Sequence, residues 1–318
     1  MGKYSKNDIR FSSLWNSVWK ARNVYMLIIP GLIWYLFFAY MPMYGLTLAF
    51  RTYKANLGIF RSPWIGFENF VYVFRDPRFF ESIKTTLIIN FGRLIFSFPF
   101  PILLALAINE VRVGRIKKVM HTIFTFPHFL SWVLVSGIMI NFLSLDGFVN
   151  SIVKFLGEEP INFLGNQKLF LPFVFITATW KSAGWNSIIY LSAITGIDTE
   201  QYQAAEIDGA SRLQRILYIT LPNIMSTIAV MFILAVGRLM TEGFDQIFNM
   251  SNAAVRSVSE TLDMYIYNIT FRGAVDFSFS TAVSLFKSVI NLLLLLLANR
   301  VLIWISGNGL FGSKEDLK

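Results

Sequence analysis

The residues that most often carry catalysis or bind metals are few in this chain of 318 residues. There is no cysteine, which excludes disulfides, thiolate zinc sites and catalytic thiols. The two histidines, His121 and His128, have no acidic residue at metal-ligand or base spacing, so structural roles are favoured for both. The stretch GNGLFGSK (307–314) is superficially similar to a phosphate loop, but Ser313 stands where a lysine must directly follow the glycine. We therefore expect no catalytic residue, metal site, cofactor or nucleotide on this chain.

Charged residues inside apolar segments form a second chemical pattern. All of them are basic: Arg93, Lys181, Arg238, Lys287 and Arg300. A charged side chain at membrane depth costs roughly 2.5–3.5 kcal/mol, so something must compensate each cation. Carboxylates of a passing acidic substrate could do so, as could backbone carbonyls, water or the acids of a partner subunit. Proton relays favour carboxylates at mid-membrane, so the lack of Asp and Glu in these segments argues against secondary transport.

Polar and aromatic side chains in the same segments are candidates for lining a transport pathway. Embedded polar groups are expensive in lipid and are expected to face a protein interior or a cavity, whereas aromatic rings offer stacking surfaces. The alternative for the aromatic residues is anchoring at the membrane interface. Arg300 is expected to reach the cytoplasmic interface. The candidate pathway residues are Asn141, Trp180, Lys181, Trp185, Asn186, Tyr190, Arg238 and Lys287.

Long apolar segments must position these residues. Hydrophobic residues make up 55% of the chain and charged residues 15%, which excludes a soluble domain. Segments of about 20 apolar residues can cross a bilayer as helices. The predicted fold class is therefore an all-α membrane protein with six transmembrane helices. We place them near 24–50, 85–108, 119–143, 170–193, 218–240 and 280–305.

The distribution of positive charge predicts the orientation. Basic residues gather in the tail before the first span and in the short loop near 109–118, which places both in the cytoplasm. Six crossings then give a cytoplasmic tail at 1–23, a transmembrane domain at 24–305 and a cytoplasmic tail at 306–318. The net charge of +9 is scattered, without a basic stripe carrying interleaved aromatic residues, so nucleic acid is not an expected partner.

The cytoplasmic segment 197–222, IDTEQYQAAEIDGASRLQRILYITLP, predicts two short helices with a break. Asp198 can cap the first helix with Gln201 three residues on, and Gly209 can turn sharply. Ser211 followed by Gln214 is a capping box that begins the second helix. From these local signals alone, an ordinary amphipathic loop is the alternative.

YQAAEIDGA (202–210) with the later Leu221 and Pro222 resembles the EAA loop of binding-protein-dependent ABC importer permeases. The resemblance implies a coupling helix that docks on a cytoplasmic ATPase, with Gly209 as the elbow. One departure is Gln203, where the family has a glutamate; it removes a charge but keeps a hydrogen-bonding amide. The coupling residues implied are Tyr202, Gln203, Ala204, Ala205, Asp208, Gly209, Ala210 and Arg212.

The similarity extends over nearly the whole chain and points to the branch that serves complex polysaccharides. It is carried by MPMYGLTLAF (41–50), SPWIGFENF (62–70), LALAINEVR (104–112), FPHFLSW (126–132), WKSAGWNSIIYLSAITGID (180–198), GFDQIF (243–248) and TAVSLFKSVINLLLLLLANR (281–300). It implies the type I importer fold, the bacterial inner membrane and a non-catalytic subunit. The implied partners are a second permease, two ATPases that bind ATP and Mg, a solute-binding protein and an oligosaccharide. The other hypotheses are a transporter or channel acting without an ATPase, and a membrane sensor with a permease-like body.

Overall fold

The structure is a computed structural model that describes residues 19–306 except 112 and 274. Within those residues it contains helices and no β-strand; one isolated bridge joins Arg51 and Trp64. The predicted all-α architecture is confirmed for this part of the chain. The predicted tails fall largely outside the described residues.

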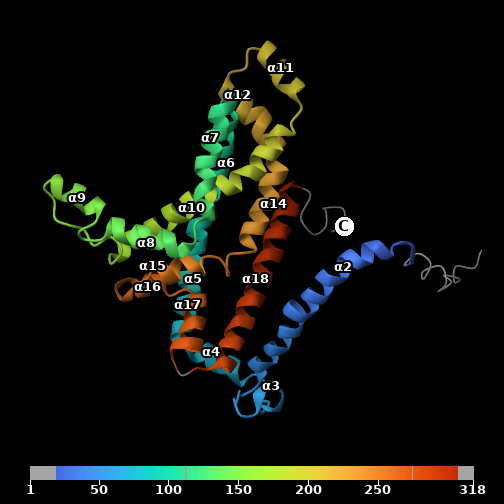
Figure 1. Ribbon diagram of the computed structural model, residues 1–318, viewed down its shortest axis with the longest axis vertical. Coiled ribbons are helices and arrows are strands. Elements are labelled where there is room, and N and C mark those ends of the chain that lie inside the picture. The colour runs from blue at the N-terminus through green and yellow to red at the C-terminus, as the bar shows by residue number, and fades with distance from the viewer. Residues whose placement is uncertain (1–18, 112, 274, 307–318) are drawn as a thin grey trace, which may run out of the picture.

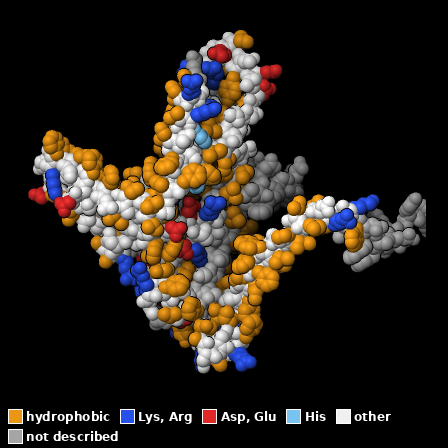
Figure 2. Space-filling view, in the orientation of Figure 1, with side chains coloured by type: hydrophobic (Ala, Val, Ile, Leu, Met, Phe, Trp, Pro, Cys, Tyr) orange, Lys and Arg blue, Asp and Glu red, His pale blue; other side chains and the backbone are white. Residues whose placement is uncertain are grey.

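The first predicted span is a continuous helical segment made of α2 (Arg22–Tyr35), η1 (Leu36–Tyr40) and η2 (Met41–Phe50). Figure 1 shows α2 standing apart from the rest of the molecule, while η2 reaches α18 (Phe277–Ser306) at its far end. None of the most apolar window of this segment is buried, and hydrophobic side chains follow the length of α2 in Figure 2. The segment is long and apolar enough to cross a membrane but packs little against its own chain.

The second, fourth, fifth and sixth predicted spans each correspond to observed helices. Pro77–Asn109 contains α5 (Pro77–Phe96) and α6 (Pro99–Asn109) and covers the second predicted span; Phe277–Trp304 covers the sixth. The fifth is a bent pair, Arg212–Asn223 and Met225–Val236, with 62° between its halves. The fourth lies within α10 (Gln167–Thr195), which has 29 residues but carries Lys168 and Lys181. By length and composition alone four described helical segments can cross a membrane, or five with the bent pair; α10 is not one of them, and the four are Arg22–Phe50, Pro77–Asn109, Trp132–Phe155 and Phe277–Trp304.

The third predicted span, 119–143, is wrong as one helix. The chain forms α7 (Gly114–Thr125) and η3 (Phe126–Phe129), breaks at Leu130 and Ser131, and restarts as α8 (Trp132–Leu143), followed by α9 (Phe148–Phe155). Figure 1 shows α7 running beside α6, whereas α8 and α9 turn sideways. Leu130 is extended and Ser131 caps α8 by accepting a hydrogen bond from Leu134 N at 3.3 Å. A polar N-cap in the middle of an apolar run therefore ends one helix and begins another.

The remaining elements lie at the two ends of the bundle. α3 (Gly58–Arg61), α4 (Glu68–Arg75) and α17 (Leu262–Tyr267) lie toward one end in Figure 1, and α11 (Thr199–Ile207) and α12 (Arg212–Arg215) lie at the other. The turn between α6 and α7 is at the same end as α11 and α12, as the prediction of two cytoplasmic loops requires. The elements not yet bounded are η4 (Ile216–Thr220), α13 (Leu221–Asn223), α14 (Met225–Val236), α15 (Phe244–Met250), η5 (Ala253–Val255), α16 (Arg256–Ser259) and η6 (Asn268–Arg272).

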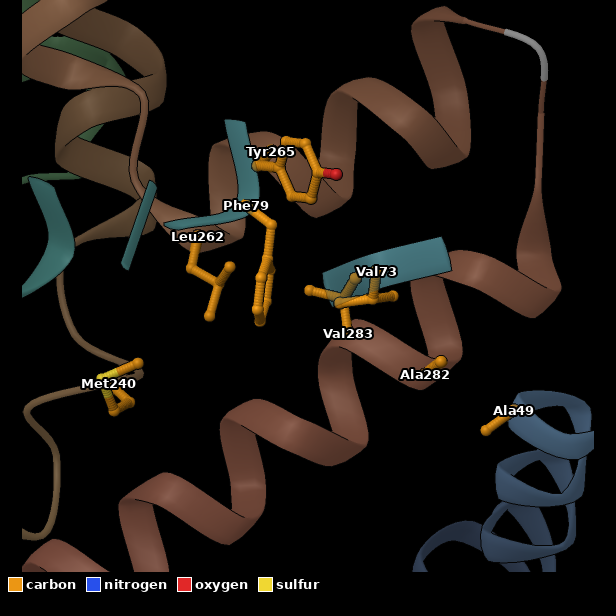
Figure 3. Close-up of a cluster of buried hydrophobic side chains, with 8 residues drawn as sticks. All are labelled: Ala49, Val73, Phe79, Met240, Leu262, Tyr265, Ala282 and Val283. Atoms are coloured by element: carbon orange, nitrogen blue, oxygen red, sulfur yellow. The ribbon is translucent and has the colours of Figure 1, made fainter. Parts of the chain in front are cut away.

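A cluster of buried apolar side chains joins the ends of several helices. Figure 3 shows side chains from η2, α4, α5, α17 and α18, with Met240 from the turn after α14. Helices in lipid associate by close packing, and the small Ala49 and Ala282 permit it here. The eight members are Ala49, Val73, Phe79, Met240, Leu262, Tyr265, Ala282 and Val283.

Candidate transport cavity and coupling tip

A cavity of about 350 Å³ lies among α5, α6, α10, α14 and the turn that leads into α15. Four of the eight predicted pathway residues line it: Lys181, Asn186, Tyr190 and Arg238. Asn141, Trp180, Trp185 and Lys287 are not among its lining residues. Its wall also contains polar residues that the sequence did not single out as pathway residues: Asn90, Arg93, Ser97, His128, Ser182, Glu242 and Gln246.

Arg93 is the most deeply buried charged residue of the cavity wall, with 9% of its surface exposed. Its Nη1 donates to Asn90 Oδ1 at 3.3 Å and its Nη2 donates to Gln246 Oε1. Gln246 is fixed in turn, because its Nε2 donates to Val174 O and Thr177 Oγ1, both at 2.8 Å. These contacts join α5, α10 and α15 at one point of the wall.

Gly243 allows this arrangement at the start of α15. Its φ is +99°, a conformation that L side chains rarely adopt. A Cβ on Gly243 would also overlap the guanidinium of Arg93. The stretch GFDQIF thus brings two required features together: a glycine that makes room for Arg93, and Gln246, which accepts its hydrogen bond.

Lys181 is compensated by backbone, one of the alternatives that the sequence left open. Its Nζ donates to His128 O at 2.7 Å and to Pro127 O at 3.4 Å, and it lies 5.6 Å from the Trp132 ring centroid. Helical hydrogen bonding ends at the break between α7 and α8, and the ammonium group binds two carbonyls beside it, of which Pro127 O also accepts from Leu130 N at 3.2 Å. Lys181 therefore stabilises the break as well as lining the cavity.

The aromatic candidates divide between the cavity and its surroundings. Tyr190 is 2% exposed and lies in the wall. Trp185 stacks on His128, with ring centroids 4.5 Å apart and planes at 3°. Trp180 is 43% exposed and lines no part of the cavity. Asn141 is also exposed, and its Nδ2 donates to Gly137 O at 2.9 Å within α8.

Lys287 has an acid partner within the chain, a form of compensation that the sequence analysis did not consider. Its Nζ forms an ion pair with Asp263 Oδ1, and the two side chains are 12% and 23% exposed. Asp263 belongs to α17, outside the predicted spans, so a count of acids within spans missed it. Arg93, Lys181 and Arg238 form no ion pair with a described residue.

The predicted tip adopts the two-helix turn that its local signals indicate. Asp198 caps α11 by accepting from Glu200 N at 2.9 Å, and Gly209 has a φ of +75°. Ser211 and Gln214 form the predicted capping box, with bonds of 2.8 and 3.4 Å. Gln201 differs from the expectation, because its Oε1 accepts from Asn223 Nδ2 at 3.0 Å and binds the following helical segment.

Side-chain contacts within 202–220 stabilise the tip, and some of its apolar side chains are exposed. Tyr202 Oη lies 2.9 Å from Thr220 Oγ1, and Arg215 lies 3.5 Å from Glu206. Ile207 is 87% exposed and Tyr218 is 76% exposed. Gln203, Ala204 and Arg212 are also exposed. A hollow of about 330 Å³ is lined by Ala205, Asp208, Gly209, Ala210, Gln214, Arg215, Tyr218 and Ile219.

The described residues contain no group of three or more His, Asp or Glu side chains that could hold a metal ion. The candidate site is thus a cavity of mixed polar and apolar lining that carries three cations in its wall, and the exposed tip is separate from it.

Comparison with known proteins defines the class. The family described as binding-protein-dependent transport system inner membrane component matches residues 97–304. The chain belongs to this family, whose members are non-catalytic permease subunits of ABC transporters, and it is of the carbohydrate branch. The multi-pass location in the inner membrane follows from the same match and from the apolar helices.

Three similar proteins show which ABC permeases this chain resembles. The polygalacturonan/rhamnogalacturonan transport system permease protein YteP of Bacillus subtilis (strain 168) is 43% identical over 279 residues, 87% of each chain. Protein LplB of the same organism is 41% identical over 290 residues, 91% of each chain. A crystal structure of a bacterial ABC transporter involved in the import of the acidic polysaccharide alginate matches with a TM-score of 0.85 and 37% identity, covering 92% of this chain and 99% of that one. The fold is thus that of an ABC importer permease.

Proposed function

We propose that this chain is one permease half of an ATP-driven importer for oligosaccharides from acidic polysaccharides, of pectic or alginate type. The observation that carries the proposal is the cavity wall, where Arg93, Lys181 and Arg238 outnumber the one lining acid, Glu242. An excess of positive charge in a low-dielectric cavity favours anionic ligands. The polygalacturonan and alginate transporters to which the chain is similar support the same substrate class.

The proposal includes partners on both sides of the membrane. The exposed apolar side chains of the tip, including Ile207 and Tyr218, fit docking on a cytoplasmic ATPase that binds ATP and Mg. A second permease would cover the unburied first span. An alginate transporter similar to this chain was solved with an oligosaccharide-bound periplasmic protein, which supports a solute-binding protein at the outer face. Both termini are proposed to be cytoplasmic.

Reconstitution tests the need for partners. The chain alone in liposomes is expected to move no sugar, because it has no nucleotide site and one coupling tip. The complete complex is expected to require ATP and the loaded binding protein. Transport down a gradient at full rate by the chain alone would contradict the proposal and favour a carrier or channel that acts without an ATPase.

Substrate charge is tested by comparing a uronate oligosaccharide with a neutral one of equal length. Arg238→Gln is expected to lower the uronate rate more than the neutral rate, because Arg238 lines the cavity and forms no ion pair with a described residue. Lys181→Gln is expected to discriminate less, since Lys181 already binds carbonyls. Arg300→Gln, an exposed residue that does not line the cavity, is the control. Equal losses for both sugars in Arg238→Gln would contradict charge selection.

A further inference from the structure

Arg93 lies in the cavity wall with one nitrogen of its guanidinium unpaired. Its Nε is buried and has no hydrogen-bond partner. The neighbouring Nη2 donates only to the amide oxygen of Gln246, and Nη1 donates to the amide oxygen of Asn90. Both acceptors are neutral, and no described carboxylate forms an ion pair with Arg93; Glu242 lines the same cavity and acts on Arg93 only at longer range.

Another arginine of the chain binds a carboxylate through Nε and Nη2. Arg256 binds Glu260 through the same two nitrogens, with Nε to Oε2 at 3.3 Å and Nη2 to Oε1 at 2.8 Å. Two parallel charge-assisted bonds of this kind are stronger and more directional than one bond to an amide. At Arg93, Gln246 Oε1 accepts only from Nη2, whereas a carboxylate could accept from both Nη2 and Nε.

The neighbours hold Arg93 in place for such a ligand. Gln246 is anchored to Val174 O and Thr177 Oγ1, and Asn90 is anchored because its Nδ2 donates to Leu239 O at 2.6 Å. Gly243 packs so closely against Nη1 that a Cβ on this residue would overlap it. A guanidinium fixed in this way loses little freedom when it binds a ligand.

We propose that Arg93, flanked by Asn90 and Gln246, is a carboxylate subsite of the cavity that takes one uronate carboxylate of the transported oligosaccharide. The inference rests on the proposed function, because it needs an acidic substrate. Gln246 turns aside and gives up its bonds to Val174 O and Thr177 Oγ1, and the carboxylate then accepts hydrogen bonds from both Nε and Nη2 of Arg93. Neutral sugars have no group that can do the same, so the subsite favours the uronate.

The decisive variant is Gln246→Glu, which puts a carboxylate beside Arg93 in place of the neutral amide and removes the donor to Val174 O and Thr177 Oγ1. The measurement is the ratio of kcat/KM for a uronate oligosaccharide to that for a neutral one of equal length, in the complete reconstituted complex. We expect this ratio to fall about tenfold, because the internal carboxylate competes for bonds of charge-assisted strength. Gln246→Met, which removes the amide without adding charge, is expected to lower the ratio far less. Gln167→Glu, the same substitution outside the cavity, is expected to leave it unchanged.

The possible outcomes are distinct. A wild-type complex that does not prefer the uronate would overturn the acidic-substrate proposal and this inference together. A wild-type preference that survives in Gln246→Glu, or that falls equally in Gln246→Met, would overturn the subsite alone. If Gln246→Glu does not assemble, Arg93→Lys decides, since it keeps the charge but cannot form the paired bonds. An unchanged ratio in that variant would overturn the subsite, and an about tenfold loss would support it.

Discussion

The turn at the coupling tip and the wall around Arg93 are held by contacts of very different range along the chain. The caps of the tip join residues two or three positions apart, as in Asp198 with Glu200 and Ser211 with Gln214. The wall joins residues 69 to 153 positions apart, through Gln246, Thr177 and Arg93. A locally encoded element can change without the bundle, whereas the wall depends on the correct packing of α5, α10 and α15. Substitutions in the wall are therefore expected to lower the stability of the bundle, whereas substitutions in the tip are expected to leave the bundle intact.

The largest effect is expected for Gly243→Ala. The substitution adds a Cβ that overlaps Arg93 and puts alanine at a φ of +99°, so we expect a loss of about 3 kcal/mol in stability. Thermal unfolding of the detergent-solubilised complex would measure it, together with loss of uptake. Gly137→Ala is the matched control, because Gly137 lies in α8 and a Cβ there meets nothing within 4 Å. Similar stability of the two variants would refute a tightly packed wall.

Asp263→Asn is expected to have the next largest effect. It leaves Lys287 charged and mostly buried without its partner, which costs about 2–3 kcal/mol in stability. Lys287→Met combined with Asp263→Asn is expected to recover most of the loss, since it removes the uncompensated charge. A double-mutant cycle from thermal unfolding checks this. Additive losses in the double variant would show that the pair contributes no coupling.

Gly209→Val is expected to spare the bundle and damage coupling. Valine resists the φ of +75° by about 1–3 kcal/mol, but a Cβ at this position meets no atom within 4 Å. The complex should therefore assemble, with several-fold weaker stimulation of its ATPase by loaded binding protein. Gln203→Ala, at an exposed helical position, should do less. Unaltered stimulation in Gly209→Val would remove the elbow from the coupling mechanism.

Asp76→Asn is expected to have the smallest effect, at the opposite end of the molecule from the tip. Partial burial of the carboxyl favours a higher pKa, but bonds from Tyr265 Oη at 2.6 Å and Arg78 N at 2.9 Å outweigh it and hold the pKa of Asp76 below its usual value. A carboxyl with a lowered folded-state pKa contributes stability above its unfolded pKa and loses it as pH falls through the folded one. The melting temperatures of wild type and variant should differ at pH 7 and converge below about pH 4. A constant difference down to pH 2 would exclude this linkage.

The range of the contacts also explains what the sequence could predict. Asp198, Gly209 and the Ser211–Gln214 pair have local signatures, and each was predicted in its observed role, apart from the partner of Gln201. The all-helical fold and most spans followed from hydrophobicity. Gln246 and Asn90 carry no such signature, because their roles exist only where distant helices meet. Asp263 was missed for the same reason: it lies outside the predicted spans, yet folding brings it to Lys287.

The bend between Arg212–Asn223 and Met225–Val236 has a mechanical consequence. The two segments meet at 62°, and Ile224 at the joint is completely buried among Tyr190, Ile194 and Ala105. A force applied along the first segment therefore has a large component across the axis of α14. The side chains that α14 contributes to the cavity, Met231, Leu234 and Ala235, lie on the arm that such a force would swing. If the tip docks on an ATPase as proposed, a push there would reach the cavity as a sideways rotation, with the buried joint as its pivot.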